Sequence, residues 1–452
     1  MYGSQSTRVG VSRAPYSGDR AYAKLPPMTN PHSLSRPLRF DIESAAFKRD
    51  PGPTLAAMRA AGPVIPMRLP FIGRTWVTTT HAATGTMLKD KAGFVRESRN
   101  AGRTGIAGMR WWMPRSLKLL TENMLMKDEP DHRRLRKLVD GAFQRRGVQA
   151  MRGRIEALAD TMLDGIEADI RATGSADLVE GYARRLPLEV ICELLGLPDQ
   201  DRGEFAHWTK VGTGMTSAWG FFRALRALKK LIRYVRDQIE ACRRAPRPGL
   251  ITELLREEDG DRLSEAELIS MVFLLLIAGF ETTTHLIATS VVALNRHPGQ
   301  RAWLMADPSA RIERAVEELA RYTTPVQMTK PRYVARDLEL EGQALRRGEL
   351  ITGFLASANH DAEVFEAPGE LRLDRFPNPH LVFGSGIHFC LGMQLARVEV
   401  QAALTRLYGR LPDLVLPDDH ELDWIERLGL RGVASLPVRP AKVALGENHR
   451  GR

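Results

Sequence analysis

The chain has 452 residues, 43% of them hydrophobic and 26% charged, and its formal net charge is +11. This composition is typical of a globular protein that buries a sizeable core. The three cysteines, Cys192, Cys242 and Cys390, are odd in number and far apart, which excludes a disulfide framework and a CxxC zinc site. This cysteine usage fits a reducing, intracellular location. The positive charge alone is compatible with a nucleic acid, an acidic protein partner or solubility, and no interleaved aromatic and basic pattern favours nucleic acid.

The first 38 residues differ in composition from the rest of the chain. They are rich in Gly, Pro, Ser and Arg and show no apolar periodicity, so the sequence predicts a disordered basic tail over residues 1–38. The N-terminus lacks the apolar core segment of a secretory signal. Residues 443–452 are predicted to be a second tail, which leaves residues 39–442 as the predicted folded domain.

Most of the remaining chain predicts helix, because apolar residues recur three or four positions apart. The clearest helical segments are residues 153–174, 223–245 and 311–324. Strand patterns are short and few, and the clearest are residues 74–80, 332–342 and 349–359. The sequence therefore predicts a large, mainly helical protein with small β-sheets and without internal repeats.

A basic helix is predicted around the sequence DHRRLRKLV, residues 131–139. His132 and Arg136 are four positions apart in this segment, so they share one face of the helix. Taken alone, the pattern is typical of a solvated basic helix.

The longest apolar run, Leu268–Phe280, is shorter than the about 20 residues that a membrane span needs, so the sequence predicts a buried helix here. The run continues directly into Glu281, Thr282 and Thr283. A carboxylate and hydroxyls in a buried helix are costly unless they are paired or functional. The structural alternative is that Thr282 or Thr283 donates to the carbonyl one turn earlier and merely bends the helix.

The most distinctive segment is the loop FGSGIHFCLG, Phe383–Gly392, which precedes a long helical pattern. Its glycines allow positive φ angles and close approach of the backbone to a ligand. Cys390 lies at the start of the predicted helix, where free N–H groups and the helix dipole stabilise a thiolate. The loop lacks the third glycine of a dinucleotide fingerprint. These features favour a soft metal held by one sulfur over a buried structural cysteine.

The stretch FGSGIHFCLGMQLAR resembles the haem-ligand loop of the cytochrome P-450 family, the haem-thiolate monooxygenases, and it meets every fixed position of the pattern FGxGxHxCxGxxLAR. The resemblance implies that Cys390 is the axial thiolate on the iron of haem b and that Phe383 packs near the sulfur. It also implies a single large, triangular, mainly helical fold over residues 39–442. In this fold haem lies between the oxygen-binding helix and the helix that follows the cysteine loop.

The same resemblance implies roles for residues elsewhere in the chain. Ala278 and Gly279 would leave open space on the oxygen-binding helix. Glu281 and Thr282 would relay protons during oxygen activation, as positioned acid–base groups do. The residues expected to contact the haem propionates are His132, Arg136, Arg332 and His388.

Glu318 and Arg321 in the sequence EELARY are three positions apart and are neighbours on one helix face. Taken alone, they are typical of a surface ion pair. The family has a buried ExxR pair at this place, so the resemblance implies a structural role, with Arg375 as the third partner.

The resemblance implies an enzyme, a monooxygenase that inserts one atom of dioxygen into an apolar organic substrate by hydroxylation or epoxidation. The chain has no flavin or iron–sulfur cysteine signature, so a separate acidic ferredoxin or flavodoxin with its reductase is expected to deliver the electrons. A cytoplasmic enzyme without a membrane span and without a nucleic-acid partner is expected. The basic residues that would dock the electron carrier are Arg133, Arg134, Lys137, Arg145 and Arg146.

Three alternatives remain open at this point. A peroxide-driven peroxygenase would use the same haem site but would not need the relay of Glu281 and Thr282. A haem-based gas sensor or carrier would bind haem without catalysis and would not need Thr282. A basic nucleic-acid-binding protein would explain the charge but would leave the cysteine loop without a role.

Overall fold

The computed structural model describes residues 37–70, 72–104, 121–201, 218–256, 262–416 and 422–441. The two predicted tails lie almost entirely outside these ranges, so their disorder and the domain limits stay predictions. The side chains of two predicted docking residues, Arg145 and Arg146, also lie outside the described part of the chain.

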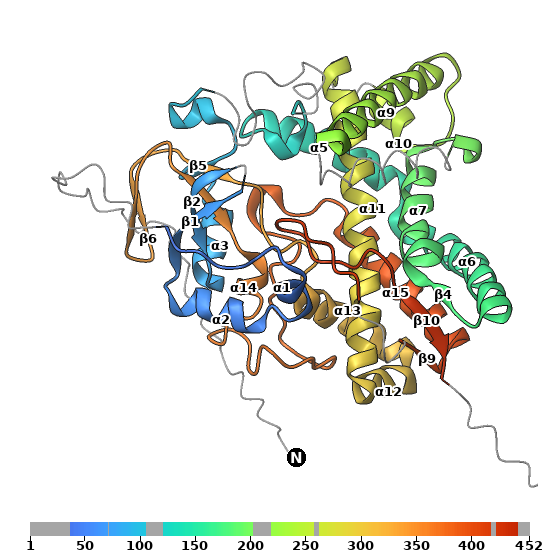
Figure 1. The fold of residues 1–452 in the computed structure, drawn as a ribbon. Coiled ribbons are helices and arrows are strands. Elements are labelled where there is room, and N and C mark those ends of the chain that lie inside the picture. Colours follow the sequence, from blue (N-terminus) through green and yellow to red (C-terminus); the bar gives the residue numbers. More distant parts are fainter. Residues whose placement is uncertain are drawn as a thin grey trace, which may run out of the picture. The chain divides into compact units, whose positions relative to one another are not determined.

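Helices make up most of the described chain (Figure 1). The longer ones are α5 (Asp131–Arg146), α6 (Arg152–Thr173), α7 (Arg185–Leu195), α9 (Ala218–Arg244), α11 (Glu265–Arg296), α13 (Pro308–Thr323) and α15 (Met393–Arg410). The shorter ones are α1 (Ala45–Arg49), α2 (Gly52–Ala60), α3 (His81–Lys89), α10 (Leu250–Leu255), α12 (Pro298–Ala306) and α14 (Leu355–Ala358). Single 3-10 or π turns are η1 (Ser98–Ala101), η2 (Met124–Met126), η3 (Val148–Met151), η4 (Val179–Ala183), η5 (Asp199–Asp201) and η6 (Gly386–His388). The three clearest predicted helices are therefore confirmed as α6, α9 and α13.

The described strands form three sheets. The largest has the order β1 (Val64–Leu69), β2 (Gly73–Thr78), β8 (Leu350–Gly353), β5 (Arg332–Val334) and β3 (Phe94–Val95). The others are β4 (Ala176–Asp177), β10 (Pro437–Pro440) and β9 (Leu414–Val415), and the pair β6 (Leu338–Leu340) and β7 (Gln343–Leu345). Within the largest sheet, β1 and β2 form an antiparallel hairpin, β2 pairs in parallel with β8, and β5 pairs antiparallel with β8 and β3. The mainly helical fold with small sheets is thus as the sequence predicts.

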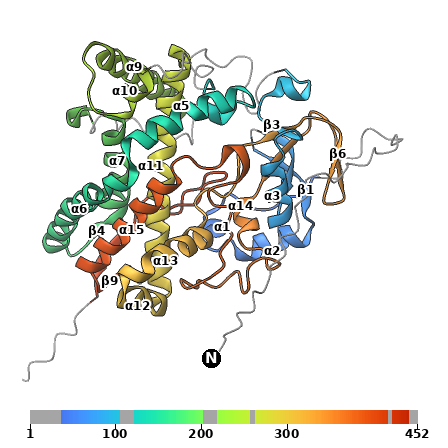
Figure 2. The same cartoon turned by 180° about the vertical axis from the view of Figure 1, so that it is seen from behind.

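Helix α11 is the central element of the main core. It begins at a capping box, in which the Ser264 hydroxyl accepts from the Glu267 amide and the Glu267 carboxylate accepts from the Ser264 amide at 2.8 Å. Figures 1 and 2 show α11 with α7 on one side and α13 on the other, and it packs against α7, α13 and α15. The predicted burial of Leu268–Phe280 is confirmed for most of its residues.

Among the described helices, α11 is the one long and apolar enough to cross a membrane by length and composition, and 61% of its most apolar 18-residue window is buried inside the protein. Such burial is typical of a core helix, because a membrane-spanning helix would present this apolar surface to lipid.

A fully buried charge network connects α13 to the segment that leads to the cysteine loop. Glu318 accepts two bonds from the Arg321 guanidinium, at 2.7 and 2.8 Å, and both of its carboxylate oxygens accept from Arg375 Nε at 3.1 Å. Arg321 also donates to the carbonyl oxygens of Asn359 and Pro368. The predicted pair and its third partner therefore lie together, and they tie α13 to the backbone that precedes the cysteine loop.

Candidate active site

The cysteine loop is a tight turn that places Cys390 just before α15. Gly384 and Gly386 have φ angles of 72° and 71°, which only glycine adopts without strain. A Cβ atom on Gly386 would lie 2.3 Å from the carbonyl oxygen of Leu88, so the backbone of α3 occupies that space. The amide of Cys390 donates to the carbonyl of Phe383 at 2.9 Å and closes the turn.

The Cys390 thiol faces a cavity of about 420 Å³. Burial raises the pKa of Cys390, and the amide of Gly392 and the charges of Arg136 and Arg397 oppose that rise. A thiolate in this position therefore needs a cation, because a bound metal ion deprotonates a coordinating thiol. In the part of the chain that the structure describes, no three His, Cys, Asp or Glu side chains converge on a metal site. A site with one sulfur suits an ion that brings its other ligands with it, as haem iron does.

Nine of the ten predicted site residues line this cavity, and Glu281 is the exception. They come from α5, α11, β5 and the cysteine loop, which are far apart in the sequence. The nine are His132, Arg136, Ala278, Gly279, Thr282, Arg332, Phe383, His388 and Cys390.

Two arginines on the cavity wall have donors without partners. Arg332 is 1% exposed and donates from Nη1 to the carbonyl oxygens of Met87 and Leu88, while its Nε and Nη2 have no partner among the described residues. Arg96 donates from Nη1 to the Lys330 carbonyl at 2.6 Å, and its Nε likewise has no partner in the described part of the chain. Burial lowers the pKa of Arg332 to about 10 and, together with the charge of Arg332, that of Arg96 to about 9. Buried N–H groups of a charged guanidinium are normally hydrogen-bonded, so these donors indicate that an anionic acceptor binds here.

Two histidines lie against each other beside these arginines. The rings of His132 and His388 meet edge to face with centroids 4.6 Å apart. Burial lowers the pKa of His388 to about 2, and it also lowers that of His132, so both rings are neutral at physiological pH. Arg136 donates to the Phe389 carbonyl at 2.7 Å, and its charge is balanced by Asp140 at 2.9 Å.

The charges on this wall match a cofactor with two carboxylates. Three cationic side chains, Arg96, Lys330 and Arg332, line the cavity, and the carboxylates whose charges act on the two arginines are Asp128 and Asp90. Asp128 is already satisfied by the backbone amides of Arg96 and Glu97, at 2.7 and 2.9 Å. Arg96 and Arg332 keep guanidinium donors without a partner in the described part of the chain, and the two propionates of haem would accept from them. The residues present therefore fit haem.

Helix α11 presents two different surfaces at the predicted oxygen site. Thr282 lines the cavity, and its hydroxyl donates to the Ala278 carbonyl at 2.9 Å, which is the back-bond that the structural alternative predicts. A Cβ atom on Gly279 would lie 3.1 Å from the Ile191 side chain, so this glycine also serves the packing of α7. The Glu281 carboxylate lies 2.8 Å from the Arg427 guanidinium, and its side chain is 17% exposed.

Four residues with a place at this site are absent from the sequence-based prediction: Arg96, Lys330, Glu399 and Arg427. Glu399 of α15 is 1% exposed and lines the cavity, and burial raises its pKa well above the ordinary range while Thr283 opposes that rise. Its only sequence signal is a carboxylate between two valines in an amphipathic helix. Arg427 has no local signal, because its partner lies on another element.

Comparison with known proteins decides the family. Residues 312–433 match the family model described as Cytochrome P-450. Over 403 residues the chain is 39% identical to the vitamin D(3) 25-hydroxylase of Pseudonocardia autotrophica, which covers 88% of this chain and 96% of that protein. The chain belongs to the cytochrome P-450 family. This P-450 is also 37% identical over 412 residues to the polyketide biosynthesis cytochrome P-450 PksS of Bacillus subtilis, covering 90% of this chain and 99% of the relative. The solved structure of PksS superposes with a TM-score of 0.80 at 36% identity and covers 89% of this chain and 100% of that one.

Membership confirms the predicted fold class, enzyme class and cofactor. This P-450 is a haem-thiolate monooxygenase of the bacterial type that acts on organic substrates.

Proposed function

We propose that this P-450 holds haem b in the cavity beside Cys390 and hydroxylates or epoxidises an apolar substrate. The observation that carries the proposal is a single thiol on the wall of a cavity that is also lined by two buried arginines, whose guanidinium donors lack partners among the described residues. Haem with a thiolate ligand supplies the oxygen-activating chemistry, because the thiolate donates electron density that favours O–O cleavage.

The residues of the wall would hold the cofactor in distinct ways. Cys390 would bind the iron, and Phe383 would shield the sulfur from water, since both line the cavity from the same tight turn. Arg332 would meet a propionate with its free Nε and Nη2 donors. His132 and His388 line the same wall and would each donate a ring N–H to a propionate.

Thr282 and Glu281 would move protons. Thr282 lines the cavity, so its hydroxyl would transfer a proton to a reacting oxygen and would then be reprotonated through Glu281. Glu281 is partly exposed and paired with Arg427, so it would take protons from solvent. The two proton-transfer roles favour a monooxygenase over a peroxygenase. Hydrogen peroxide already carries the protons that dioxygen must receive, so a peroxygenase would not need the relay.

The substrate proposed is a large apolar organic molecule. The described lining on the α11 side is apolar and includes Ile191, Leu274, Leu275 and Val326. One relative is named for vitamin D(3), which is a large and mostly apolar alcohol, and another for polyketide biosynthesis. Pockets of this kind bind mainly through apolar contact with a few polar groups for orientation.

Electrons are proposed to come from a separate ferredoxin or flavodoxin with its reductase, in the cytoplasm. Of the predicted docking residues, Arg133 is 72% exposed and pairs with Glu129 at 2.6 Å, whereas Arg134 pairs with Glu267 and is only 30% exposed. Arg133 is therefore the described α5 residue best placed to meet an acidic carrier. Lys137 has a partner of its own within the protein.

The test is the carbon monoxide difference spectrum of the reduced protein. The wild type should show thiolate ligation, Cys390→Ala should lose it, and the control Cys242→Ala, a buried cysteine in α9, should keep it. A wild-type spectrum without thiolate character would refute the proposal. Efficient peroxide turnover without a carrier would favour the peroxygenase, and a lack of NAD(P)H consumption with reductase and substrate would favour the sensor.

A further inference from the structure

Two arginines lie over the same aromatic ring near the C-terminal end of the described chain. The guanidinium carbons of Arg431 and Arg296 are 5.1 and 6.0 Å from the ring centroid of Trp424. Neither arginine forms an ion pair with any residue that the structure describes. The face of an aromatic ring attracts a cation, but two cations at one ring repel each other. A bound anion would offset this repulsion.

Arg431 is the more buried of the two, with 6% of its surface exposed. Its Nε donates to the Lys48 carbonyl at 2.7 Å, and its Nη1 donates to the Thr323 carbonyl at 3.2 Å. Its Nη2 donates to the Arg49 carbonyl at 3.4 Å. A guanidinium has five N–H groups, so one on each Nη atom has no partner in the described part of the chain. Burial, and then the charge of Arg431, lower the pKa of Lys48, a second buried cation without an ion pair within the described ranges. Buried charges are normally paired, so these two cations indicate that an anion binds nearby.

A hollow of about 150 Å³ opens beside these side chains. Its walls come from residues 49–52, the C-terminal half of α11, the end of α13 and the segment that carries Trp424 and Arg431. Trp424 is 3% exposed, and its Nε1, the one hydrogen-bonding atom of the side chain, has no partner among the described residues. The hollow at Trp424 is therefore lined by a buried indole N–H donor as well as by arginines.

The size and the charge of this hollow limit its ligand. It has room for about five water molecules at about 30 Å³ each, so a small ion fits inside and a nucleotide does not. The walls carry one carboxylate, Asp50, which is exposed and accepts from the Gly52 amide at 3.3 Å. They also carry three arginines, Arg49, Arg296 and Arg431. Positive charge therefore exceeds negative charge on the walls.

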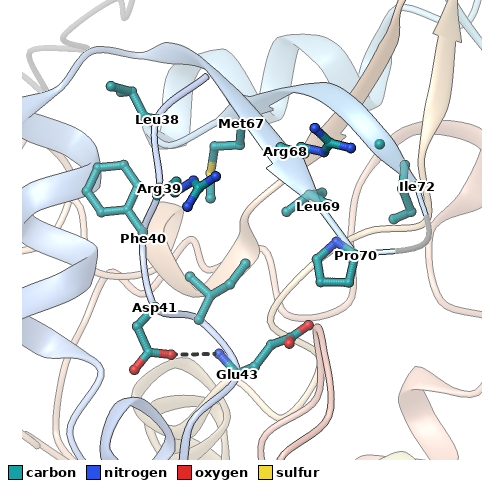
Figure 3. A pocket seen from close by; sticks show the side chains of 12 residues that line it. Leu38, Arg39, Phe40, Asp41, Glu43, Met67, Arg68, Leu69, Pro70 and Ile72 are labelled. Atoms are coloured by element: carbon teal, nitrogen blue, oxygen red, sulfur yellow. Dashed lines mark hydrogen bonds between the residues drawn. The ribbon is translucent and has the colours of Figure 1, made fainter. Parts of the chain in front are cut away.

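A larger hollow elsewhere lacks these features. Figure 3 shows this hollow of about 760 Å³, with Arg39 and Arg68 on neighbouring segments. Both arginines are exposed, and Asp41 and Glu43 line the same walls. Its described lining includes no buried side-chain donor without a partner. Exposed cations of this kind hold an anion only weakly, because water screens their charge.

We propose that the hollow at Trp424 binds one phosphate ion. The N–H groups of a guanidinium match the oxygen pairs of phosphate, and an indole N–H adds a further donor. A tetrahedral oxyanion accepts from donors on several sides at once, whereas chloride offers no oxygen pair to a guanidinium. The bound ion would connect α11 to the segment that carries Trp424 and Arg431, so it would stabilise the fold. The hollow shares no lining residue with the cavity at Cys390, and the inference is independent of the proposed function.

The experiment is equilibrium dialysis of the haem-loaded protein against phosphate, with sodium chloride added to hold the ionic strength constant. The wild type should bind one phosphate saturably. Trp424→Phe keeps the ring but removes the Nε1 donor, and Arg296→Gln removes an exposed charge. Each variant should bind phosphate about 10-fold more weakly, because each removes a hydrogen bond to a charged ligand. Phosphate should also raise the urea midpoint of unfolding in the wild type, and much less in these two variants.

Matched controls make the same changes elsewhere. Trp303→Phe removes an indole N–H from α12, and Arg68→Gln removes an exposed arginine from the hollow in Figure 3. Both controls should bind phosphate as the wild type does. An absence of saturable binding by the wild type, or equal losses in Arg68→Gln and Arg296→Gln, would overturn the proposal in favour of adventitious binding to the basic surface only. Chloride that binds as tightly as phosphate would also overturn it.

Glycerol 1-phosphate distinguishes two sources of the phosphate group. If it binds the wild type as tightly as phosphate does and is lost in Trp424→Phe, the result supports the site with a phosphoryl group of a larger molecule as its ligand. If phosphate binds and glycerol 1-phosphate does not, the result supports the free ion.

Discussion

Lys48 in α1 is a buried lysine that forms no ion pair with a carboxylate in the described part of the chain, and it predicts a specific dependence of stability on pH. Its side chain is fully buried, and its ammonium donates to the Gln327 amide oxygen at 2.5 Å. Burial lowers the pKa of Lys48 to about 7, and the charge of Arg431 adds to this effect. In the unfolded chain a lysine has a pKa of about 10.4.

The magnitude follows from the difference between these two pKa values. Between pH 7 and pH 10 the unfolded state binds more protons at Lys48 than the folded state, so the free energy of unfolding rises with pH. A difference of roughly 3.5 pKa units costs the folded protein about 5 kcal/mol below pH 7, and about 2 kcal/mol of this is recovered between pH 7 and pH 9. Lys48→Met removes the titration. It also leaves the Gln327 oxygen without a donor, at a cost of about 1–3 kcal/mol that does not vary with pH.

The assay is urea unfolding of the haem-loaded protein, followed by circular dichroism, for the wild type and Lys48→Met at pH 7, 8 and 9. The stability of the wild type relative to the variant should increase by about 2 kcal/mol from pH 7 to pH 9. Lys229→Met, an exposed lysine of α9, is the control and should show no such trend. A difference between wild type and Lys48→Met that stays constant over this range would refute the reasoning, because Lys48 would then keep its proton in both states.

Three further predictions concern the active site and its support. Thr282→Ala should retain the thiolate spectrum but divert reducing equivalents to peroxide, measured as product formed per NADPH consumed, and full coupling would remove Thr282 from the mechanism. Arg96→Gln should weaken haem retention roughly 10- to 100-fold, measured as transfer of haem to apomyoglobin, because it removes one charged donor worth about 1.5–3 kcal/mol; retention equal to the wild type would exclude Arg96 from propionate binding. Glu318→Gln should destabilise the fold by about 3–5 kcal/mol in urea unfolding, because Arg321 and Arg375 would share a buried site without a counter-charge. A loss below about 1 kcal/mol would show that water or backbone carbonyls compensate the two arginines.

The parts of the site that the sequence predicts are those that depend on consecutive residues. The cysteine loop is one continuous turn, so the sequence alone shows that its glycines and Cys390 belong to the same site. Helix α11 can be predicted as a buried helix, because its apolar run is continuous and longer than a typical strand. In both cases local geometry and function are encoded in the same ten to fifteen residues.

The cations on the cavity wall are different, because distant pairing brings them together. Arg96 follows β3, and Arg332 begins β5, and these two strands meet through the pairs Phe94–Val334 and Val95–Tyr333. No local pattern in either segment reveals the pairing, since β3 has only two residues. The role of Arg96 therefore becomes visible only when the sheet is known.

The proposed relay on α11 illustrates how helix geometry separates residues that are neighbours in the sequence. Ala278, Thr282 and Leu286 are four positions apart and line the cavity as one stripe. Glu281 is displaced from Thr282 by about 100° around the helix axis, so its carboxylate lies on the adjacent face and meets Arg427. In the proposed relay, a proton that Glu281 takes from solvent would therefore cross from one face of α11 to the adjacent face before it reaches the Thr282 hydroxyl. A water molecule or a rotation of the Glu281 side chain away from Arg427 can make that crossing, and Arg427→Gln should then ease the rotation while Arg427→Lys preserves the ion pair. Equal coupling in both variants would leave water as the carrier.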